Sequence, residues 1–348
     1  MKVAVVLYNL GGPDTSADVQ PFLFNLFSDP MIISAPAPLR WLIAKLISTR
    51  RAPIAREIYN HIGGGSPLLA NTQAQANALD EALGASGGNE YRTFVAMRYW
   101  HPMADAVARE VNDYAPDQIV LLPLYPQFST TTVGSFLRVW QKAAQSIGLM
   151  CPTHTICCYP TEPGFVAATA GSVRAALRKV GDEKRVRVLF SAHGLPKKIV
   201  AGGDPYQWQV EQTAKAVVEE LAIAGLDWLN CYQSRVGPLE WIGPSTEDEI
   251  RRAGAEGLAV VIVPLAFVSE HSETLVELDI EYRRVGDGAG VTAYHRTPTV
   301  SVTDTFIAGL ERLISVALSD NPSPCSGSGG RLCSGQWSQC PCAIGVAS

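Results

Sequence analysis

The sequence predicts an α/β protein built from two doubly wound halves with parallel sheets around a central cleft. Short apolar runs alternate along the chain with amphipathic segments. The runs are almost continuously apolar, which is typical of parallel strands that are covered on both faces. The alternation begins again near Cys151, so a second unit is expected to repeat the first.

The individual elements follow from these patterns, in chain order. Strands are predicted where the apolar runs stand, at residues 3–10, 93–99, 118–125, 153–159, 186–192, 228–232, 258–267 and 291–294. Helices are predicted where apolar residues recur every three or four positions, at residues 69–83, 103–114, 133–147, 164–180, 206–224 and 274–284.

These elements divide the 348 residues into three parts. Residues 1–150 form the first half, residues 151–319 the second half, and residues 320–348 a tail. The tail is rich in Gly, Ser, Pro and Cys and has no period. Composition alone predicts a disordered tail, but its four cysteines argue against that.

Composition limits the functional classes. Hydrophobic residues make up 47% and charged residues 18%, enough for a sizeable core. The formal net charge of −5 gives no basic excess, so nucleic acid is not an expected partner. The first apolar run is short and ends in "GGPD", and no run is long enough to cross a membrane, so a cytoplasmic protein is expected. Four cysteines lie among apolar runs and are expected to be reduced core residues: Cys151, Cys157, Cys158 and Cys231.

One unusually apolar segment, residues 31–47, has two interpretations. Its charged residues are Arg40 and Lys45. It is either a buried helix after a Pro-rich loop or a surface that contacts a membrane.

A histidine ends the predicted strand at residues 186–192. His193 stands at the carboxyl end, where ligands bind in such folds; Gly194 permits close approach and Pro196 fixes the exit. Its imidazole could accept a proton or bind a metal, and the alternative is a purely structural histidine. A hydrolase with Ser191 as nucleophile is disfavoured because no G-x-S-x-G motif is present.

A row of carboxylates follows the predicted strand at residues 258–267. Glu270, Glu273, Glu277 and Glu281 recur at helical spacing beside His271. A solvated acidic face of the helix is an alternative explanation that accounts for Glu277 and Glu281. A row that leads toward a histidine also suits proton removal or delivery of a divalent cation.

Polar turns could hold anions through backbone N–H groups, at residues 11–13, 62–68 and 125–135, although they match no phosphate-binding motif. Arg50, Arg51, Arg98 and Arg138 could bind carboxylates.

At this point the motifs resemble one family. "LFSAHGLP" around His193, followed by "GGDPY", resembles the ferrochelatase signature. "NLGGPDT", "YNHIGGGSPL", "MRYWHP", "YPQFSTTT", "YQSRVGPLEWIGP" and "SEHSETLVELDIEY" agree with it in order, over roughly residues 3–318.

The resemblance implies a class II chelatase-like fold of two Rossmann-like halves. It implies an enzyme that inserts Fe²⁺ into a porphyrin with release of two protons, the last step of haem biosynthesis. His193 and Glu273 match the catalytic and metal-contacting pair. Glu270, His271 and Glu277 match a metal or proton track. Whether His193 acts as a base or as an iron ligand stays open.

The resemblance also implies a porphyrin site. Its matching positions are Leu10, Arg50, Arg51, Tyr59, Ser66, Arg98, Tyr99, Trp241 and Phe267. A leucine at position 10 is similar to members that act on protoporphyrin IX, whereas members acting on coproporphyrin carry a tyrosine there. The alternatives are a coproporphyrin III ferrochelatase, a cobalt chelatase of the same fold, or a non-catalytic haem-binding module. Binding alone needs no proton acceptor such as His193.

The remaining implications concern surroundings and cofactor. Residues 31–47 resemble the family's lip, which implies peripheral contact with the inner membrane. Some members carry a C-terminal 2Fe–2S cluster, and some of these use one internal cysteine, in one branch near position 158. Here Cys325, Cys333, Cys340 and Cys342 could supply all four ligands. Two disulfides or free thiols are the alternative, and the oligomeric state is not predicted.

Overall fold

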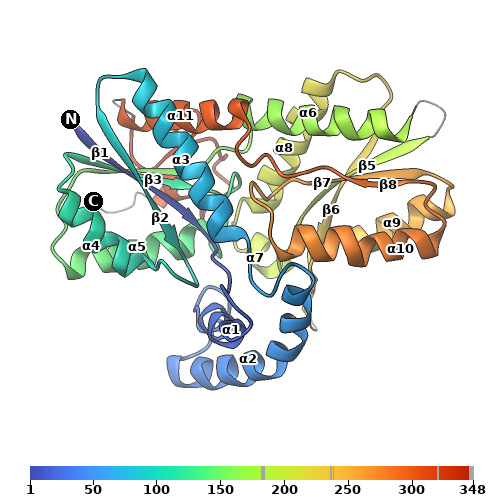
Figure 1. Ribbon diagram of the computed structural model, residues 1–348, viewed down its shortest axis with the longest axis horizontal. Helices are drawn as coiled ribbons and strands as arrows, with labels where there is room; N and C mark the ends of the chain where they lie inside the picture. Colours follow the sequence, from blue (N-terminus) through green and yellow to red (C-terminus); the bar gives the residue numbers. More distant parts are fainter. Residues whose placement is uncertain (182–184, 236, 238, 320, 345–348) are drawn as a thin grey trace.

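A computed structural model describes residues 1–181, 185–235, 237, 239–319 and 321–344, and Figure 1 shows two parallel sheets side by side. The first sheet has the order β2-β1-β3-β4-β9. Its strands are β1 (Lys2–Asn9), β2 (Glu90–Met97), β3 (Gln118–Pro123), β4 (Thr153–Cys158) and β9 (Cys325–Ser326). The second sheet has the order β6-β5-β7-β8. Its strands are β5 (Val186–His193), β6 (Asp227–Gln233), β7 (Ala259–Pro264) and β8 (Tyr294–Arg296).

Helices cover both faces of the first sheet, as predicted. Val5 and Leu7 of β1 pack toward α3 (Leu68–Ser86) and α11 (Asp304–Leu318). Val6 and Tyr8 pack on the opposite face. The helices of that face are α4 (Ala104–Tyr114) and α5 (Val133–Ser146). The continuous apolar run of β1 therefore reflects burial on both sides.

The second sheet is covered in the same way. Phe190 of β5 faces α6 (Pro163–Val180) and α8 (Tyr206–Leu221). Leu189 and Ile262 face the other side. That side is covered by α9 (Thr246–Ala255), the π-helix η1 (Glu273–Glu281) and α10 (Tyr282–Ala289). The prediction of two doubly wound halves is confirmed.

The boundary between the halves differs from the prediction. β4 pairs with β3 through Ile119–Thr153 and Val120–His154, so the first sheet extends beyond residue 150. The chain crosses to the second sheet only through α6. It then returns, because Leu310 and Leu313 of α11 pack in the first core. The C-terminal helix thus completes the first half, which sequence order could not reveal.

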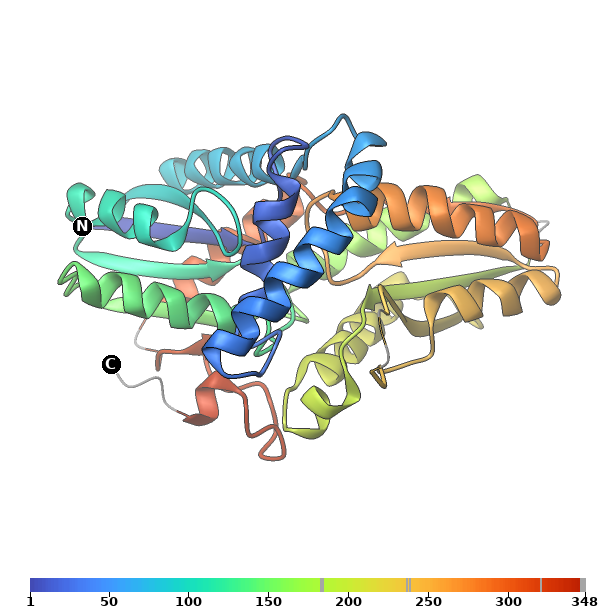
Figure 2. The ribbon, with the colours of Figure 1, turned by 90° about the horizontal axis from the view of Figure 1, so that it is seen from below.

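Helices α1 (Val19–Phe27) and α2 (Ala37–Asn60) project together from the body, and Figure 2 shows them crossing the middle of the molecule. Helix α2 buries a narrow stripe that includes Ala44, Ser48 and Ala52. The residues of its other face are large, apolar and exposed: Leu39, Trp41, Leu42, Leu46 and Ile54. The alternative of a buried helix at residues 31–47 is therefore wrong for this segment, since Trp41 is 57% exposed. Among the described residues, no helix has the length and apolar character to cross a membrane.

The described part of the tail packs onto both halves. β9 pairs in parallel with β4 through Ile156 and Cys325. Beyond it, the Trp337 ring lies 6.3 Å from that of Trp208 on α8. The Gln339 N–H donates to the Gly203 carbonyl at 3.1 Å, just after the short helix α7 (Lys197–Ala201). The last described element is α12 (Pro341–Ile344). Tertiary contacts order a segment whose composition favours disorder.

Candidate active site

His193 stands at the end of β5 with its ring orientation fixed. Its Nδ1 lies 2.7 Å from the Gly194 carbonyl oxygen. A carbonyl only accepts, so the ring proton lies on Nδ1 and Nε2 keeps its lone pair. The side chain is 39% exposed, and the Tyr206 hydroxyl donates to the backbone oxygen of His193 at 3.0 Å. The site thus presents a basic nitrogen that can accept a proton or bind a metal.

Glu273 faces that nitrogen from the first residue of η1. Its Oε1 lies 3.9 Å from Nε2 of His193, beyond hydrogen-bond range but close enough for both atoms to reach one substrate centre. Burial raises the pKa of Glu273, the nearby His193 lowers it, and Glu277 raises it again, for a net rise. A π-helix is rare and is frequently found at functional sites. The predicted pair is therefore brought together.

Glu277 lies one turn further along η1 and is anchored to the end of β6. It accepts hydrogen bonds from the Ser234 backbone N–H at 2.9 Å and the Ser234 hydroxyl at 2.6 Å. Gln233 and Tyr282 donate to it as well, each at 3.0 Å. Ser234 adopts a positive φ of 59°, which aims both of its donors at the carboxylate. Glu277 is held in the cleft beside Glu273.

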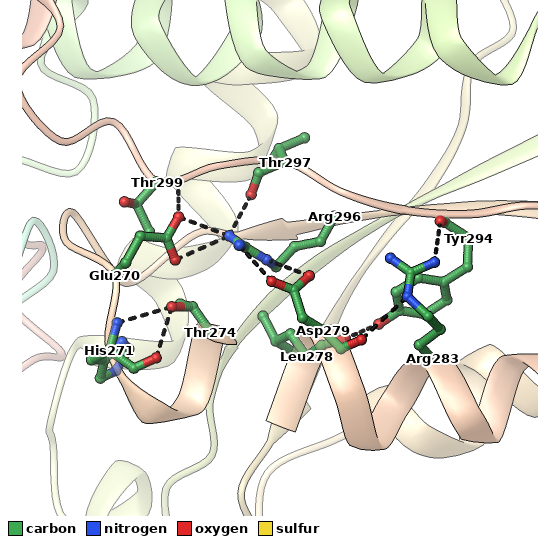
Figure 3. A network of polar contacts seen from close by, with 10 residues as sticks. All are labelled: Glu270, His271, Thr274, Leu278, Asp279, Arg283, Tyr294, Arg296, Thr297 and Thr299. Atoms are coloured by element: carbon green, nitrogen blue, oxygen red, sulfur yellow. Dashed lines mark hydrogen bonds and ion pairs between the residues drawn. The ribbon is translucent and has the colours of Figure 1, made fainter. Parts of the chain in front are cut away.

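Glu270 does not extend this row, contrary to the prediction of a track that includes it. Figure 3 shows its carboxylate paired with Arg296 of β8, at 2.9 Å and 3.1 Å. The Thr299 N–H also donates to it at 3.0 Å. Burial alone would raise the pKa of Glu270, but the Arg296 charge and the hydrogen bonds lower it overall. Arg296 also binds Asp279 at 2.7 Å, so it clamps the segment before η1 to the helix itself.

His271 is buried rather than placed on a proton path. Burial lowers its pKa to about 4, so the ring is neutral near pH 7. Its ring centroid lies 4.5 Å from that of Phe267. Among the described residues its Nδ1 has no hydrogen-bond partner. His271 therefore packs behind the catalytic pair, beside Phe267.

The predicted apolar wall forms where the projecting helices meet the first sheet. Leu10 packs against the cluster that contains Tyr59 and Tyr99. Burial raises the pKa of Tyr59 to about 12, and its hydroxyl is hydrogen-bonded to Ser272, next to Glu273. Trp241 lies beside Gly194, where an added Cβ would come within 3.2 Å of its ring. Gly194 therefore makes room between His193 and this ring.

The predicted polar positions fall into two groups. Arg50 and Arg51 are exposed on α2, and among the described residues no ion pair holds either of them. The Arg98 guanidinium forms an ion pair with the Asp29 carboxylate at 2.8 Å, and the Tyr99 hydroxyl donates to the same carboxylate at 2.7 Å. Tyr99 is 1% exposed. These two residues fix the segment that leads to α2. Arg98 donates through Nε to Ser135 and through Nη2 to Asp29, and the Tyr99 hydroxyl donates to Asp29.

Ser66 lies where the first turn and the loop before α3 meet. Its N–H donates to the Pro13 carbonyl at 2.8 Å. A Cβ on Gly12 would come within 2.5 Å of the Ser66 side chain, so only glycine fits there. Ser66 thus sets the shape of the wall near Tyr59.

Five cysteines form a ring of neighbouring thiols at the junction of β4 and the tail: Cys157, Cys158, Cys333, Cys340 and Cys342. Cys333 is hydrogen-bonded to Cys158 and Cys340, and Cys340 to Cys342. Cys157 lies 3.6 Å from both Cys158 and Cys342, sulfur to sulfur. All eight cysteines are described, and in this structure they are free thiols.

Cys325 lies outside this ring, contrary to its predicted role. It is 2% exposed and packs in the apolar core of the first half, where burial raises its pKa to about 11. Cys158, which the sequence suggested was an ordinary core residue, contacts the Cys333 thiol of the tail. The strand pairing of β9 directs the Cys325 side chain into the core.

Several site residues were not assigned from the sequence. Ser234 lies in "YQSRVGP" and Tyr206 in "GGDPY". Both motifs were recognised in the sequence, but no role was assigned to these two residues. Arg296 and Asp279 had no signal, because a single arginine or aspartate near a helix is common. Their importance depends on the approach of β8 to η1.

The fold of two parallel sheets, with His193 at the end of β5 and Glu273 at the start of η1, is similar to that of solved α/β proteins. SirB from Bacillus subtilis, solved with Fe³⁺, has this fold, with a TM-score of 0.52 at 11% identity over 92% of this chain and 96% of its own. DR2241 from Deinococcus radiodurans, described as similar to chelatases, gives 0.50 at 14% identity over 91% of this chain and 55% of its own.

The sequence comparisons identify the family. A family model described as Ferrochelatase matches residues 2–318. The ferrochelatase of Caulobacter vibrioides is 52% identical over 100% of this chain and 99% of its own. That of Pelagibacter ubique is 47% identical over 98% and 99%. The chain belongs to the ferrochelatase family, and it is an enzyme that inserts iron into a porphyrin in the final step of haem biosynthesis.

Proposed function

We propose that this ferrochelatase acts on protoporphyrin IX and that His193 and Glu273 remove the two pyrrole protons. The supporting observation is the position of His193 Nε2, 3.9 Å from Oε1 of Glu273, with Nδ1 of the same ring held by the Gly194 carbonyl. Nε2 accepts one N–H proton as the metal enters, and its Nδ1–H stays bound to Gly194. The raised pKa of Glu273 makes this carboxylate a better proton acceptor than an exposed one.

Glu277 provides the next acceptor. Its carboxylate already accepts from Ser234, Gln233 and Tyr282, so its position is fixed. A proton on Glu273 can pass toward it through the Ser234 hydroxyl, which lies 3.5 Å from Glu273 and 2.6 Å from Glu277. We propose this short path, without Glu270, in place of the longer predicted track.

Leu10 supports protoporphyrin IX as the substrate. It lies in an apolar cluster with Tyr59 and Phe27, where the additional propionates of coproporphyrin III would lose hydration without gaining a partner. Arg50 and Arg51 are exposed and suited to bind the propionates that protoporphyrin IX carries.

The test is Fe²⁺ insertion into each porphyrin under one detergent condition, followed by absorption. Protoporphyrin IX should have the higher kcat/KM, and Leu10→Tyr should narrow the difference. Val302→Thr, at an exposed site in the loop before α11, is the control. A higher kcat/KM for coproporphyrin III in the wild type would reject this substrate. The same assay with Co²⁺ tests the cobalt alternative.

We also propose that α2 binds the surface of the inner membrane. Trp41, Leu42 and Leu46 form an exposed apolar face next to the porphyrin wall, and Arg50 and Arg51 add positive charge. Binding to phosphatidylglycerol vesicles in a flotation assay should fall sharply in Trp41→Ser/Leu42→Ser. The control Ile223→Ser, exposed in the other half, should bind as the wild type does. Equal flotation of all three proteins would reject the proposal.

We further propose that the tail holds a 2Fe–2S cluster through Cys158, Cys333, Cys340 and Cys342. Cys333 is hydrogen-bonded to Cys158 and Cys340, and Cys340 to Cys342; the hydrogen bonds from Cys333 and Cys342 lower the pKa of Cys340 to about 3. A cluster needs thiolate ligands, so this donor set fits. No three metal-binding side chains among the described residues are arranged for a single ion. A two-iron cluster does not require this, because its ligands divide into two pairs.

The cluster proposal is tested on anaerobically purified protein by iron and sulfide content and by visible absorption. Cys333→Ser should lose the colour. Cys325→Ser is the matched control, a tail cysteine outside the ring, and should keep it. Colourless wild-type protein without iron and sulfide would reject the cluster. If Cys325→Ser loses the colour and Cys333→Ser keeps it, this ligand set is rejected.

A further inference from the structure

Gln209 of α8 is a fully buried amide at the meeting point of both halves and the tail. It is 0% exposed. Its Oε1 accepts from the Phe128 backbone N–H at 2.7 Å. A backbone N–H only donates, so the oxygen of the amide must face Phe128. The orientation of the Gln209 amide is therefore determined by its contacts.

The amide nitrogen consequently faces the thiol ring. Nε2 of Gln209 lies 3.1 Å from the Cys333 sulfur and 3.3 Å from the Cys158 sulfur. One NH₂ group has two hydrogens, and each can be donated to one sulfur. These sulfurs belong to different segments, β4 and the tail. Without the sulfurs, a buried NH₂ group would be left without acceptors, which is unfavourable.

We infer that Gln209 is a positioning residue that donates two N–H···S hydrogen bonds to the cluster ligands Cys158 and Cys333, raising the reduction potential of the cluster and retaining it. This inference rests on the proposed cluster. Hydrogen bonds to ligand sulfurs stabilise the more negatively charged, reduced form, and they are one of the factors that set the potential of iron–sulfur centres. Outer hydrogen-bond partners of ligands also affect metal retention, typically ~10–100-fold.

A second buried amide at the same interface provides the matched control. Gln127 is 2% exposed and donates to the Thr213 hydroxyl at 2.9 Å, across the junction between the halves. Among the described residues, the Gln127 side chain donates to Thr213 and to the Leu265 carbonyl and not to a thiol. Gln127→Leu therefore removes a buried amide between the halves without removing an N–H···S bond.

The experiment is an anaerobic reductive titration of the full-length protein with dithionite and mediators, followed by visible absorption. In Gln209→Leu the ratio of reduced to oxidised cluster, at the wild-type midpoint, should fall about tenfold, which is ~59 mV for a one-electron couple. Gln209→Glu has the same shape but presents a carboxylate to the sulfurs, and its midpoint should fall further. Both variants should lose iron to a chelator at least ~10-fold faster than Gln127→Leu.

The outcomes separate this inference from the cluster proposal. Wild-type midpoints in both Gln209 variants, with full iron and sulfide content, would overturn the inference and leave the cluster in place. An equal shift in Gln127→Leu would assign the effect to the interface and also overturn it. If the wild type contains no iron and sulfide, the cluster proposal fails and the inference fails with it. If Gln209→Leu does not fold, Gln209→Glu decides alone.

Discussion

Replacing Arg296 by methionine should destabilise the protein and misplace the catalytic carboxylate. The side chain of Arg296 is 9% exposed, and its partners Glu270 and Asp279 are 22% and 30% exposed. Removing one partner of a buried pair costs ~3–5 kcal/mol because a charge is left uncompensated. Because both carboxylates are partly exposed to solvent, we expect Arg296→Met to lower the free energy of unfolding by about 3 kcal/mol. That is a large part of the ~5–15 kcal/mol of a typical domain.

The effect on activity follows from the position of η1. Arg296 ties Glu270, three residues before Glu273, to Asp279 within the helix (Figure 3). A displacement of about 1 Å at a reacting group can cost ~10²-fold in rate. We expect kcat to fall by that order while KM for the porphyrin changes little, because the wall is built from other elements.

Urea unfolding and Fe²⁺ insertion measure the two effects. Arg251→Met removes an exposed pair with Glu247 and should cost less than ~1 kcal/mol. Adding Glu270→Gln and Asp279→Asn to Arg296→Met removes the unpaired charges and should recover most of the stability. A stability within 1 kcal/mol of the wild type together with an unchanged kcat in Arg296→Met would refute the reasoning.

The other predictions concern the catalytic pair and the buried histidine. His193→Ala should lower kcat by ~10²–10⁴. The protein should stay folded, since the His193 side chain is 39% exposed. The control His101→Ala, at an exposed site, should leave kcat unchanged, and near-normal turnover of His193→Ala would exclude a proton acceptor at this position. Glu273→Gln should lower kcat but raise stability at pH 7. The raised pKa of Glu273 means that the folded state holds this proton more tightly, so the carboxyl destabilises as pH rises through that pKa, and the gain in urea unfolding should vanish at pH 4 or below. For His271 the folded pKa of about 4 lies below the ordinary 6.5, so the wild type should lose stability as pH falls from 6.5 to 4; His271→Leu should flatten that slope, and parallel slopes would contradict the assignment.

The sequence by itself determined the fold class and the centre of the site. Strands buried on both faces must be apolar throughout, so β1, β3, β5 and β7 were visible as runs. A ligand-binding residue in such a fold lies at a carboxyl strand end, which located His193. The motif that follows β7 located Glu273. These features depend on local periodicity and order along the chain, which a sequence displays directly.

Tertiary structure alone decided which partners those residues meet. Glu270 and Glu277 have the same side chain, yet Arg296 neutralises the first and Ser234 holds the second in the cleft. The sequence suggested a core residue at Cys158 and a possible ligand at Cys325, but Cys158 contacts the Cys333 thiol, whereas Cys325 packs in the core of the first half. Contacts between different elements depend on how those elements pack, and no local pattern records that packing.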